Sequence, residues 1–464
     1  MRPCLTASLT SAALCLAAAG CASNDSQAPE PLAYHGATVE AIPQNVLAAA
    51  VLVRAVGFDS SYIEWSDGTG PAARTPAVGF GGDTLARVPV LGLDTATHYS
   101  FRIGLIRAGT PDALPDTLAF TSGSLPDWIP AIGSLGTSGE PGYLAISLPN
   151  GAVIVDNTGK VVWYHYSPNG ALNSFQAHPR GVYTILSTDS PEPGFLTLNA
   201  LGEETGTLAC DGRPTRFHDL LIDAGGDSWL LCDESRTMDL SGIGGNPAAT
   251  VTGTVVQHLS PAGTLLWEWN TFDHFDITDL PMADRTGPNV NFTHGNGIGF
   301  DTDGNLLLGF RSLNEVTKVD RTTGAILWRF GGLRNEFTIL NDPKGVFEHQ
   351  HGVRLAGPGQ VQLLDNGVVA PSRLVRYLVN PVAHTALMEW EFIDAPATWT
   401  AVGGATQYHP DGHATVSFGR AGRVIEVDEA GNRVWELTGL DGLYVFRAQR
   451  LSSLYDAGRG ESTR

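Results

Sequence analysis

A short hairpin pattern that ends in tryptophan recurs along this chain, and it limits the folds that the chain can adopt. Two apolar segments are joined by a polar turn that contains glycine, and the second segment ends in Trp. Clear copies occupy residues 154–163, 259–267, 319–328 and 427–435, and degenerate copies occupy 198–208 and 378–390. A unit that recurs at this interval, on the order of 45–60 residues, is typical of repeated small sheets.

The composition favours the same interpretation. The chain has 55 Gly and 28 Pro among 464 residues, and its apolar runs are short, as expected for many short strands joined by turns. We therefore predict an all-β chain in which residues 126–456 form a six-bladed β-propeller. The recurring Trp would be a structural plug between blades, and the polar residues 457–464 would be a loose tail.

Residues 32–124 have a different pattern of alternating strands. Tyr99 follows a leucine and a turn, as in the tyrosine corner of β-sandwich domains, and Trp65 is a candidate core residue. This segment resembles a fibronectin type III module. Because no chemically reactive residues cluster in it, we predict a spacing or supporting role.

The N-terminus has the features of a secretory signal over residues 1–20: one Arg, a short apolar stretch and small residues up to Gly20. The ending A-A-G-C resembles a bacterial lipobox, in which Cys21 is acylated, although Ala18 stands where leucine is usual. An ordinary cleavage site near Ala19 is the alternative. Residues 21–31 would be a tether. The expected location is the periplasmic side of the bacterial envelope, with the membrane contacted only through a lipid anchor.

Charge and cysteine content restrict the partners and the redox chemistry. The formal net charge of −20 disfavours nucleic acid and anionic membrane surfaces, so an anionic substrate needs a local positive site. Beyond the signal and Cys21, only Cys210 and Cys232 remain. In an oxidising compartment they would form a disulfide, and two buried free thiols are the alternative.

Three histidines occupy comparable places in the repeat. His218, His294 and His351 each precede an apolar strand, a tight turn and a second apolar strand. The first strand of a propeller blade lines the central channel, so we predict that the three imidazoles face one cavity. His409, in contrast, falls near a turn and is expected to face solvent.

Four further residues are candidates for the same site. Counting back from the turn at residues 303–304 places Arg311 beside His294 and Asn296. His349 lies two residues before His351 and therefore on the same strand face, either lining the pocket or supporting it. Tyr408 would stack on an aryl ring at the channel mouth. The alternatives are purely structural roles: an Arg311–Glu315 ion pair, and a turn or bulge position for Asn296.

The order of these motifs resembles the bacterial arylsulfate sulfotransferase family. The resemblance is carried by H-G-N-G-I-G-F-D-T-D-G-N-L-L-L-G-F-R-S (294–312), T-G-A-I-L-W-R-F-G-G (323–332), H-Q-H-G-V-R-L (349–355) and L-L-D-N-G (363–367). It implies transfer of a sulfuryl group between phenols without a nucleotide donor or cofactor, through a sulfohistidine at His351. It also implies that His218, His294, Asn296 and Arg311 hold sulfate oxygens or move protons. The partners would be a phenolic sulfate donor and a phenolic acceptor, with a homodimer also allowed. Unlike some family members, this chain has no cysteine pair close before the Q-H motif.

Two other classes of function remain open. Three histidines converging on a channel would also suit a zinc hydrolase, although an adjacent Arg311 would repel the cation and only Asp219 is an evident supporting carboxylate. A non-catalytic lipoprotein scaffold or ligand sensor is the second alternative, because propellers have many functions. We predict no metal in the site.

Overall fold

The computed structural model describes residues 32–82, 84–168, 174–187 and 193–456, in which every extended regular element is a β-strand. The helical elements there are short 3-10 turns, so the all-β prediction is confirmed. These turns are η1 (Pro179–Gly181), η2 (Ser241–Ile243), η3 (Thr271–Asp273), η4 (Ile277–Asp279), η5 (Met282–Arg285) and η6 (Gly419–Ala421). Within the described residues, no helix has the length and apolar character needed to span a membrane. The predicted signal peptide, Cys21, the tether and the tail lie outside these residues.

Two facing sheets make up the N-terminal part. The first has the strand order β1-β2-β6, and the second has the order β4-β3-β7-β8, with β5 paired to β3. The strands are β1 (Ala33–Ala41), β2 (Ala49–Val56), β3 (Ser60–Ser66), β4 (Ala73–Arg74), β5 (Val78–Gly79), β6 (Leu85–Val90), β7 (His98–Arg107) and β8 (Thr110–Thr121). Alternate apolar side chains of both sheets form one core. In this core Tyr99 packs edge-on against Trp65, with ring centroids 5.7 Å apart, and its hydroxyl accepts a hydrogen bond from Asp94 N at 2.7 Å.

Six more sheets, numbered 1 to 6 in chain order, are found in the described residues from 133 to 451. Sheet 1 comprises β10 (Tyr143–Leu148), β11 (Gly151–Asp156), β12 (Val161–Tyr166) and β35 (Ala448–Leu451), and sheet 2 comprises β13 (Phe175–His178), β14 (Val182–Ser187), β15 (Gly194–Leu198) and β16 (Glu204–Leu208). Sheet 3 comprises β17 (Thr215–Ile222), β18 (Ser228–Met238), β19 (Ala249–Leu259), β20 (Leu265–Asn270) and β21 (Asn289–Asn291). Sheet 4 comprises β22 (Gly295–Phe300), β23 (Leu306–Phe310), β24 (Glu315–Val319) and β25 (Ile326–Gly331). Sheet 5 comprises β26 (Thr338–Leu340), β27 (His351–Gly357), β28 (Gln360–Asp365), β29 (Arg373–Asn380) and β30 (Thr385–Phe392). Sheet 6 comprises β31 (Ala405–Tyr408), β32 (Ala414–Ser417), β33 (Val424–Val427), β34 (Arg433–Thr438) and β9 (Gly133–Gly136).

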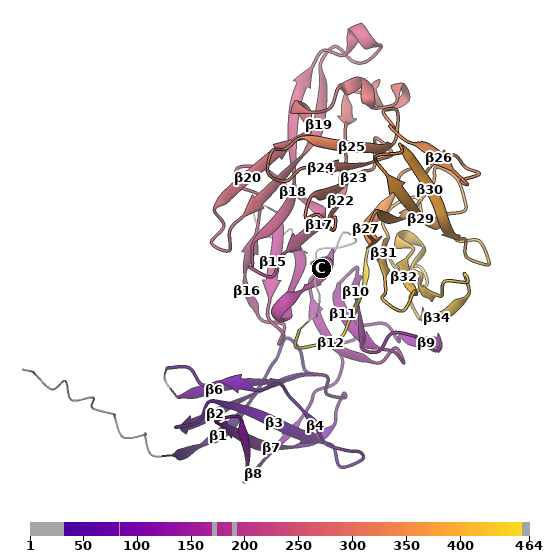
Figure 1. Cartoon of the computed structure of the whole chain (residues 1–464). Coiled ribbons are helices and arrows are strands. Elements are labelled where there is room, and N and C mark those ends of the chain that lie inside the picture. The colour runs from indigo at the N-terminus through magenta and orange to yellow at the C-terminus, as the bar shows by residue number, and fades with distance from the viewer. Residues whose placement is uncertain (1–31, 83, 169–173, 188–192, 457–464) are drawn as a thin grey trace, which may run out of the picture.

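The six sheets are arranged in a ring, with the two facing sheets of the N-terminal part to one side of it (Figure 1). One edge strand of each of sheets 3 to 6 contacts the edge strand of the next sheet: β17 with β22, β22 with β27, and β27 with β31. Strand β9 pairs with β34, and β35 pairs with β10. Backbone hydrogen bonds from both ends of the repeated region therefore hold the last and first sheets in the ring.

The recurring tryptophans connect neighbouring sheets. The indole N–H of Trp163 in sheet 1 donates to Ala200 O in sheet 2 at 3.0 Å, and that of Trp435 in sheet 6 donates to Asn157 O in sheet 1 at 2.8 Å. In sheet 3 the residue in this role is Trp269, which donates to Gly324 O at 2.9 Å. The sequence pattern pointed instead to Trp267, which lies two residues earlier on the same strand face.

A disulfide joins the outer edge of sheet 2 to sheet 3. Cys210 follows β16, Cys232 lies in β18, and the two sulfur atoms are bonded at 1.99 Å. Both residues are buried in a cluster with Leu220 and Val255. Of the two alternatives that the sequence left open, the structure contains the disulfide.

Candidate functional site

The three repeated histidines meet at the centre of the ring. His218 comes from β17, His294 immediately precedes β22, and His351 begins β27. The Nε2 atoms of His218 and His294 are 3.1 Å apart, so one ring donates a hydrogen bond to the other. The ring centroids of His218 and His351 are 6.2 Å apart. Sheets 3, 4 and 5 thus each contribute one imidazole to a single cluster.

A break in strand pairing lies at or directly after each of these histidines. The register shifts between Thr215 and Leu220 in β17, between Gly295 and Gly297 in β22, and between His351 and Arg354 in β27. Such bulges change the direction in which a side chain leaves the strand and are common beside active sites. Here they occur at the same place in three successive sheets.

The ring of His351 is fixed by hydrogen bonds at both nitrogens. Asn366 donates its amide N–H groups to Thr400 O and Gly403 O, both at 2.9 Å, which leaves Asn366 Oδ1 to accept from His351 Nδ1 at 2.8 Å. The imidazole proton is therefore on Nδ1, and the lone pair is on Nε2, which Gly403 N approaches at 3.3 Å. Burial lowers the pKa of His351 to about 4, so the ring is neutral at pH 7.

The residue after His351 has to be glycine. Gly352 has φ of +60°, and a Cβ placed on it would lie 2.8 Å from Ala405 Cα in sheet 6. Sheets 5 and 6 therefore approach each other closely at this point, and a larger residue would separate them. Two nearby histidines also have left-handed backbone, with φ of 49° at His294 and 54° at His349. Such backbone conformations are uncommon outside glycine and often occur at functional sites.

Arg311 supplies a positive charge beside the histidines. Its backbone N–H donates to His294 O at 3.0 Å, and its Nη2 lies 3.3 Å from His349 Nδ1. The alternative partner Glu315 is bonded instead to Arg329 at 2.8 Å. Within the described residues no carboxylate forms an ion pair with Arg311, and burial lowers its pKa. A cation without a counter-ion is suited to an anionic ligand.

The sequence analysis did not identify Arg216, a second cation at the site. It lies two residues before His218 in β17, is buried, and pairs with Asp233 at 2.7 Å. The signal available in the sequence was this spacing of two, which puts both side chains on one strand face. Burial, followed by the Arg216 and Arg311 charges, holds the pKa of His294 well below its ordinary value. For His218, burial and the neighbouring His294 have the same effect on the pKa.

The other predicted residues have mixed outcomes. Asn296 is the bulge residue of β22, and its amide donates to Gln350 O at 2.6 Å, so it supports the loop before His351. His349 is half-buried beside Arg311. Tyr408 is not brought to the cluster: it ends β31, whose first residues lie beside Gly352, and its hydroxyl donates to Glu429 at 2.9 Å. The described contacts connect Tyr408 to Glu429 and not to the histidines, and its stacking on an aryl ring stays a prediction.

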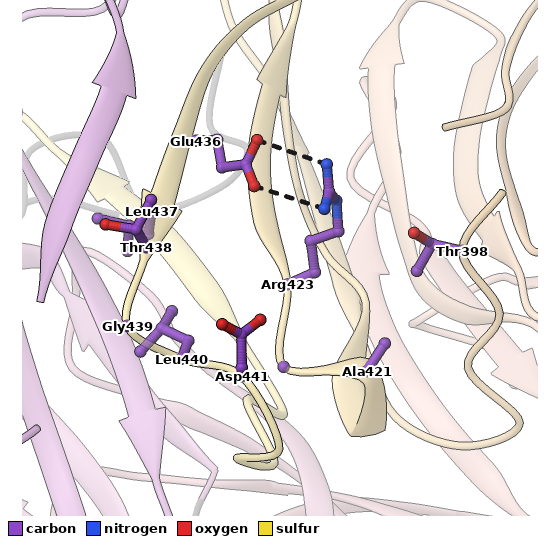
Figure 2. A pocket seen from close by; sticks show the side chains of 10 residues that line it. Thr398, Ala421, Arg423, Glu436, Leu437, Thr438, Gly439, Leu440 and Asp441 are labelled. Atoms are coloured by element: carbon purple, nitrogen blue, oxygen red, sulfur yellow. Dashed lines mark hydrogen bonds and ion pairs between the residues drawn. The ribbon is translucent and has the colours of Figure 1, made fainter. Parts of the chain in front are cut away.

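A small polar cavity in sheet 6 lies apart from these residues (Figure 2). Its volume is about 210 Å³, and an Arg423–Glu436 ion pair lies across it. None of the predicted site residues lines it. Within the described part of the chain, no group of three or more His, Cys, Asp or Glu side chains is arranged to hold a metal ion.

Comparison with known proteins gives one family match. The family model for arylsulfotransferase (ASST) matches residues 144–450 of the 464-residue chain. A search of curated proteins gives no match. Among solved structures, a protein of unknown function from Bacteroides caccae has a TM-score of 0.44 and 12% identity, over 66% of this chain and 100% of that one. A virginiamycin B lyase from Staphylococcus aureus has a TM-score of 0.34 and 10% identity, over 75% of this chain and 93% of that one.

Proposed function

Because the chain belongs to the arylsulfotransferase family, we propose that it moves a sulfuryl group from a phenolic sulfate ester to a phenolic acceptor through a sulfohistidine. No nucleotide donor or cofactor takes part. The observation that carries the proposal is the neutral His351 ring, whose Nε2 carries the lone pair and accepts only a long hydrogen bond from Gly403 N at 3.3 Å, with Arg311 nearby.

In the first step, the Nε2 lone pair of His351 attacks sulfur in line with the leaving oxygen. The S–N bond forms as the S–O bond to the aryl group breaks, and the phenolate leaves. Asn366 keeps the Nδ1 proton in place, so the sulfonated ring carries a positive charge next to its anionic sulfonate. Charge on the sulfuryl oxygens is stabilised by Arg311 and Arg216, which need no reorganisation because they are already oriented.

The hydrogen-bonded pair of His218 and His294 handles the proton of the phenol. Burial and neighbouring positive charge keep both pKa values low. An anionic ester adds negative charge, which raises these pKa values and allows the pair to take up a proton for the leaving phenolate. In the second step the acceptor phenol gives its proton to the same pair. Its oxygen then attacks sulfur, the S–N bond breaks, and neutral His351 is restored.

We also propose the finer architecture and the setting. The six sheets are the blades of a six-bladed β-propeller over residues 126–456, supported by the closure of the ring through β9 and β35. Residues 32–124 are a fibronectin type III-like sandwich, supported by the Tyr99 hydroxyl contact with Asp94 N. The protein is periplasmic, lipid-anchored at Cys21, and allowed to form a homodimer. His349 and Asn296 support the sulfuryl site.

Incubation with p-nitrophenyl sulfate and phenol tests the proposed reaction. Transfer yields phenyl sulfate together with p-nitrophenol. Release of inorganic sulfate alone would indicate a hydrolase, and neither product would indicate a scaffold or sensor. Mass spectrometry after brief exposure to the ester without acceptor should show a labile sulfuryl adduct on the peptide that contains His351.

A further inference from the structure

One carboxylate that the proposed chemistry does not use lies directly behind the histidine cluster. Asp219 follows His218 in β17 and is completely buried. A buried ionised carboxylate is costly unless several donors surround it, so its partners show what it holds in place. Burial raises the pKa of Asp219, but the charges of Arg354 and Arg447 outweigh that effect and keep it below the usual value. Asp219 is therefore an anion at neutral pH.

The partners of Asp219 come from each of the strands that carry the other two histidines. Its Oδ2 accepts from Ile298 N of β22 at 3.1 Å, four residues after His294. The same oxygen accepts from Arg354 Nη1 of β27 at 3.0 Å, three residues after His351, and Oδ1 accepts from Arg354 Nη2 at 3.3 Å. A single side chain therefore connects the three strands β17, β22 and β27.

The chain segment before β35 provides a fourth connection, to sheet 1. Arg447 Nη2 donates to Asp219 Oδ1 at 2.9 Å and to His218 O at 3.1 Å. Ser174 Oγ, just before β13 of sheet 2, also donates to His218 O, at 3.3 Å. The backbone of His218 is thus held from two sides, while its ring contacts His294.

We infer that Asp219 is a positioning residue, which together with Arg354 and Arg447 sets the location of His218 relative to His294 and His351. The expected changes in kcat rest on the proposed function. The placement of the three histidine rings by Asp219 does not depend on which substrate binds. The bulges explain why a side chain that connects the three strands is needed. Each bulge breaks the strand pairing next to a histidine, so backbone hydrogen bonds alone do not fix where the rings lie.

The test compares Asp219→Asn with Asp227→Asn. Asp227 lies at the far end of the same hairpin, paired with His258 at 2.9 Å. The asparagine at 219 retains the size of the side chain but has no charge and only one acceptor oxygen, so it cannot accept all the bonds that Ile298 N, Arg354 and Arg447 donate to Asp219. We expect kcat for transfer from p-nitrophenyl sulfate to fall about 100-fold with KM changed less than about 3-fold, because small misplacements of reacting groups have effects of this size. The Asp227 variant should stay within about 2-fold of wild type.

A double-mutant cycle separates positioning from general damage to the fold. If Asp219 acts through His218, adding Asp219→Asn to His218→Ala should lower kcat by less than about 5-fold. Independent, multiplicative effects would overturn the inference. If Asp219→Asn does not fold, Arg354→Lys is tested in its place. This variant removes the bidentate hydrogen bonds to Asp219 but keeps the positive charge. An expected loss of about 10-fold in kcat supports the inference, and wild-type kcat refutes it.

Histidine ¹⁵N NMR gives a readout that needs no turnover. In wild type, the bonded Nε2 atoms of His218 and His294 should show the shifts of a hydrogen-bonded pair, and Asp219→Asn should abolish them while His258 is unchanged. Unchanged signals for the pair would refute the positioning role even if sulfuryl transfer is established. Conversely, if wild type transfers no sulfuryl group, the proposed function fails while the NMR result still decides the role of Asp219.

Discussion

Two groups of histidines lie on the innermost strands of the ring, and they differ in what surrounds them. His351 begins β27, His294 directly precedes β22 and His218 lies within β17, whereas His178 ends β13 and His409 directly follows β31. Burial lowers the pKa of His178 to about 3 and that of His409 to about 4, much as for His351. Burial and pKa alone therefore do not distinguish the two groups.

The partners do distinguish them. Nε2 of His178 is 2.8 Å from Thr184 Oγ1, and Nε2 of His409 is 2.8 Å from Thr415 Oγ1, so each ring is satisfied within its own hairpin. The site histidines instead face one another across sheets, beside Arg311, for which no ion pair is found among the described residues. The comparison teaches that convergence from separate sheets beside an uncompensated charge separates the proposed reactive histidines from the others, which a low pKa does not.

The largest difference should appear when the nucleophile is removed. His351→Ala should lower the rate of transfer from p-nitrophenyl sulfate to phenol by about 10⁴-fold or more, because no other group supplies the Nε2 lone pair. His409→Gln, which replaces an equally buried ring, should retain most of the activity. A His351→Ala variant within 10-fold of wild type would remove the distinction between the two groups.

A smaller effect is expected from Arg311 and Arg216, whose charges act on the first group. Arg311→Met should reduce kcat by about 10²–10³-fold, since it removes an oriented donor to the charged oxygens. Arg216→Met should reduce it less, because Asp233 already balances part of the Arg216 charge. Arg321→Met, in an exposed turn of the same sheet 4, is the control. Steady-state rates that are equal for Arg311→Met and Arg321→Met would contradict the anion-binding role.

The pH dependence should separate activity from stability. Transfer requires the neutral form of His351, so kcat/KM should stay level down to about pH 6 and decline as the pH approaches about 4. His409 has a folded pKa below its ordinary value of 6.5, so between about pH 6.5 and 4 the unfolded chain binds a proton that the folded chain does not. Stability therefore falls with falling pH in this window, by up to about 1.4 kcal/mol per pH unit for each such histidine. Urea unfolding of His409→Gln should show less of this slope, with the pH profile of kcat/KM unchanged.

The disulfide should affect stability and leave the site intact. Cys210 and Cys232 are 22 positions apart in sequence, and a closed loop of this size stabilises a fold by about 3 kcal/mol. Cys210→Ser with Cys232→Ser should lower the free energy of unfolding by about that amount and change the transfer rate less than about 2-fold. A loss of activity at full folding would show that this bond positions the histidines.

The smallest expected effect is that of a chelator. Prolonged dialysis against EDTA should leave the transfer rate unchanged, because the proposed chemistry uses only imidazole and guanidinium groups. The His409→Gln variant treated in the same way is the matched control. Loss of activity on chelation that zinc restores would favour the metal-dependent hydrolase instead.

Much of the site was accessible to sequence analysis, because the three histidines repeat at one place in a repeating hairpin. The location of Arg311 beside His294 followed from counting across a turn, and the structure places the two in adjacent backbone contact. Asn366 and Arg216 were missed, since their roles depend on contacts between sheets or loops that no local pattern shows. His409 was expected to face solvent but is buried, because it lies in the β31–β32 hairpin and its ring contacts the Thr415 hydroxyl of β32.

By itself, the sequence determined the all-β architecture and the family, because strand periodicity, turn glycines and ordered motifs are local properties of the chain. Tertiary structure decided which nitrogen of His351 carries the lone pair, that Arg311 forms no ion pair among the described residues, and which histidines are hydrogen-bonded within their own hairpins. Each of these depends on atoms that are far apart in the chain and meet only when the ring of sheets closes, since hydrogen bonds and charges act over a few ångströms.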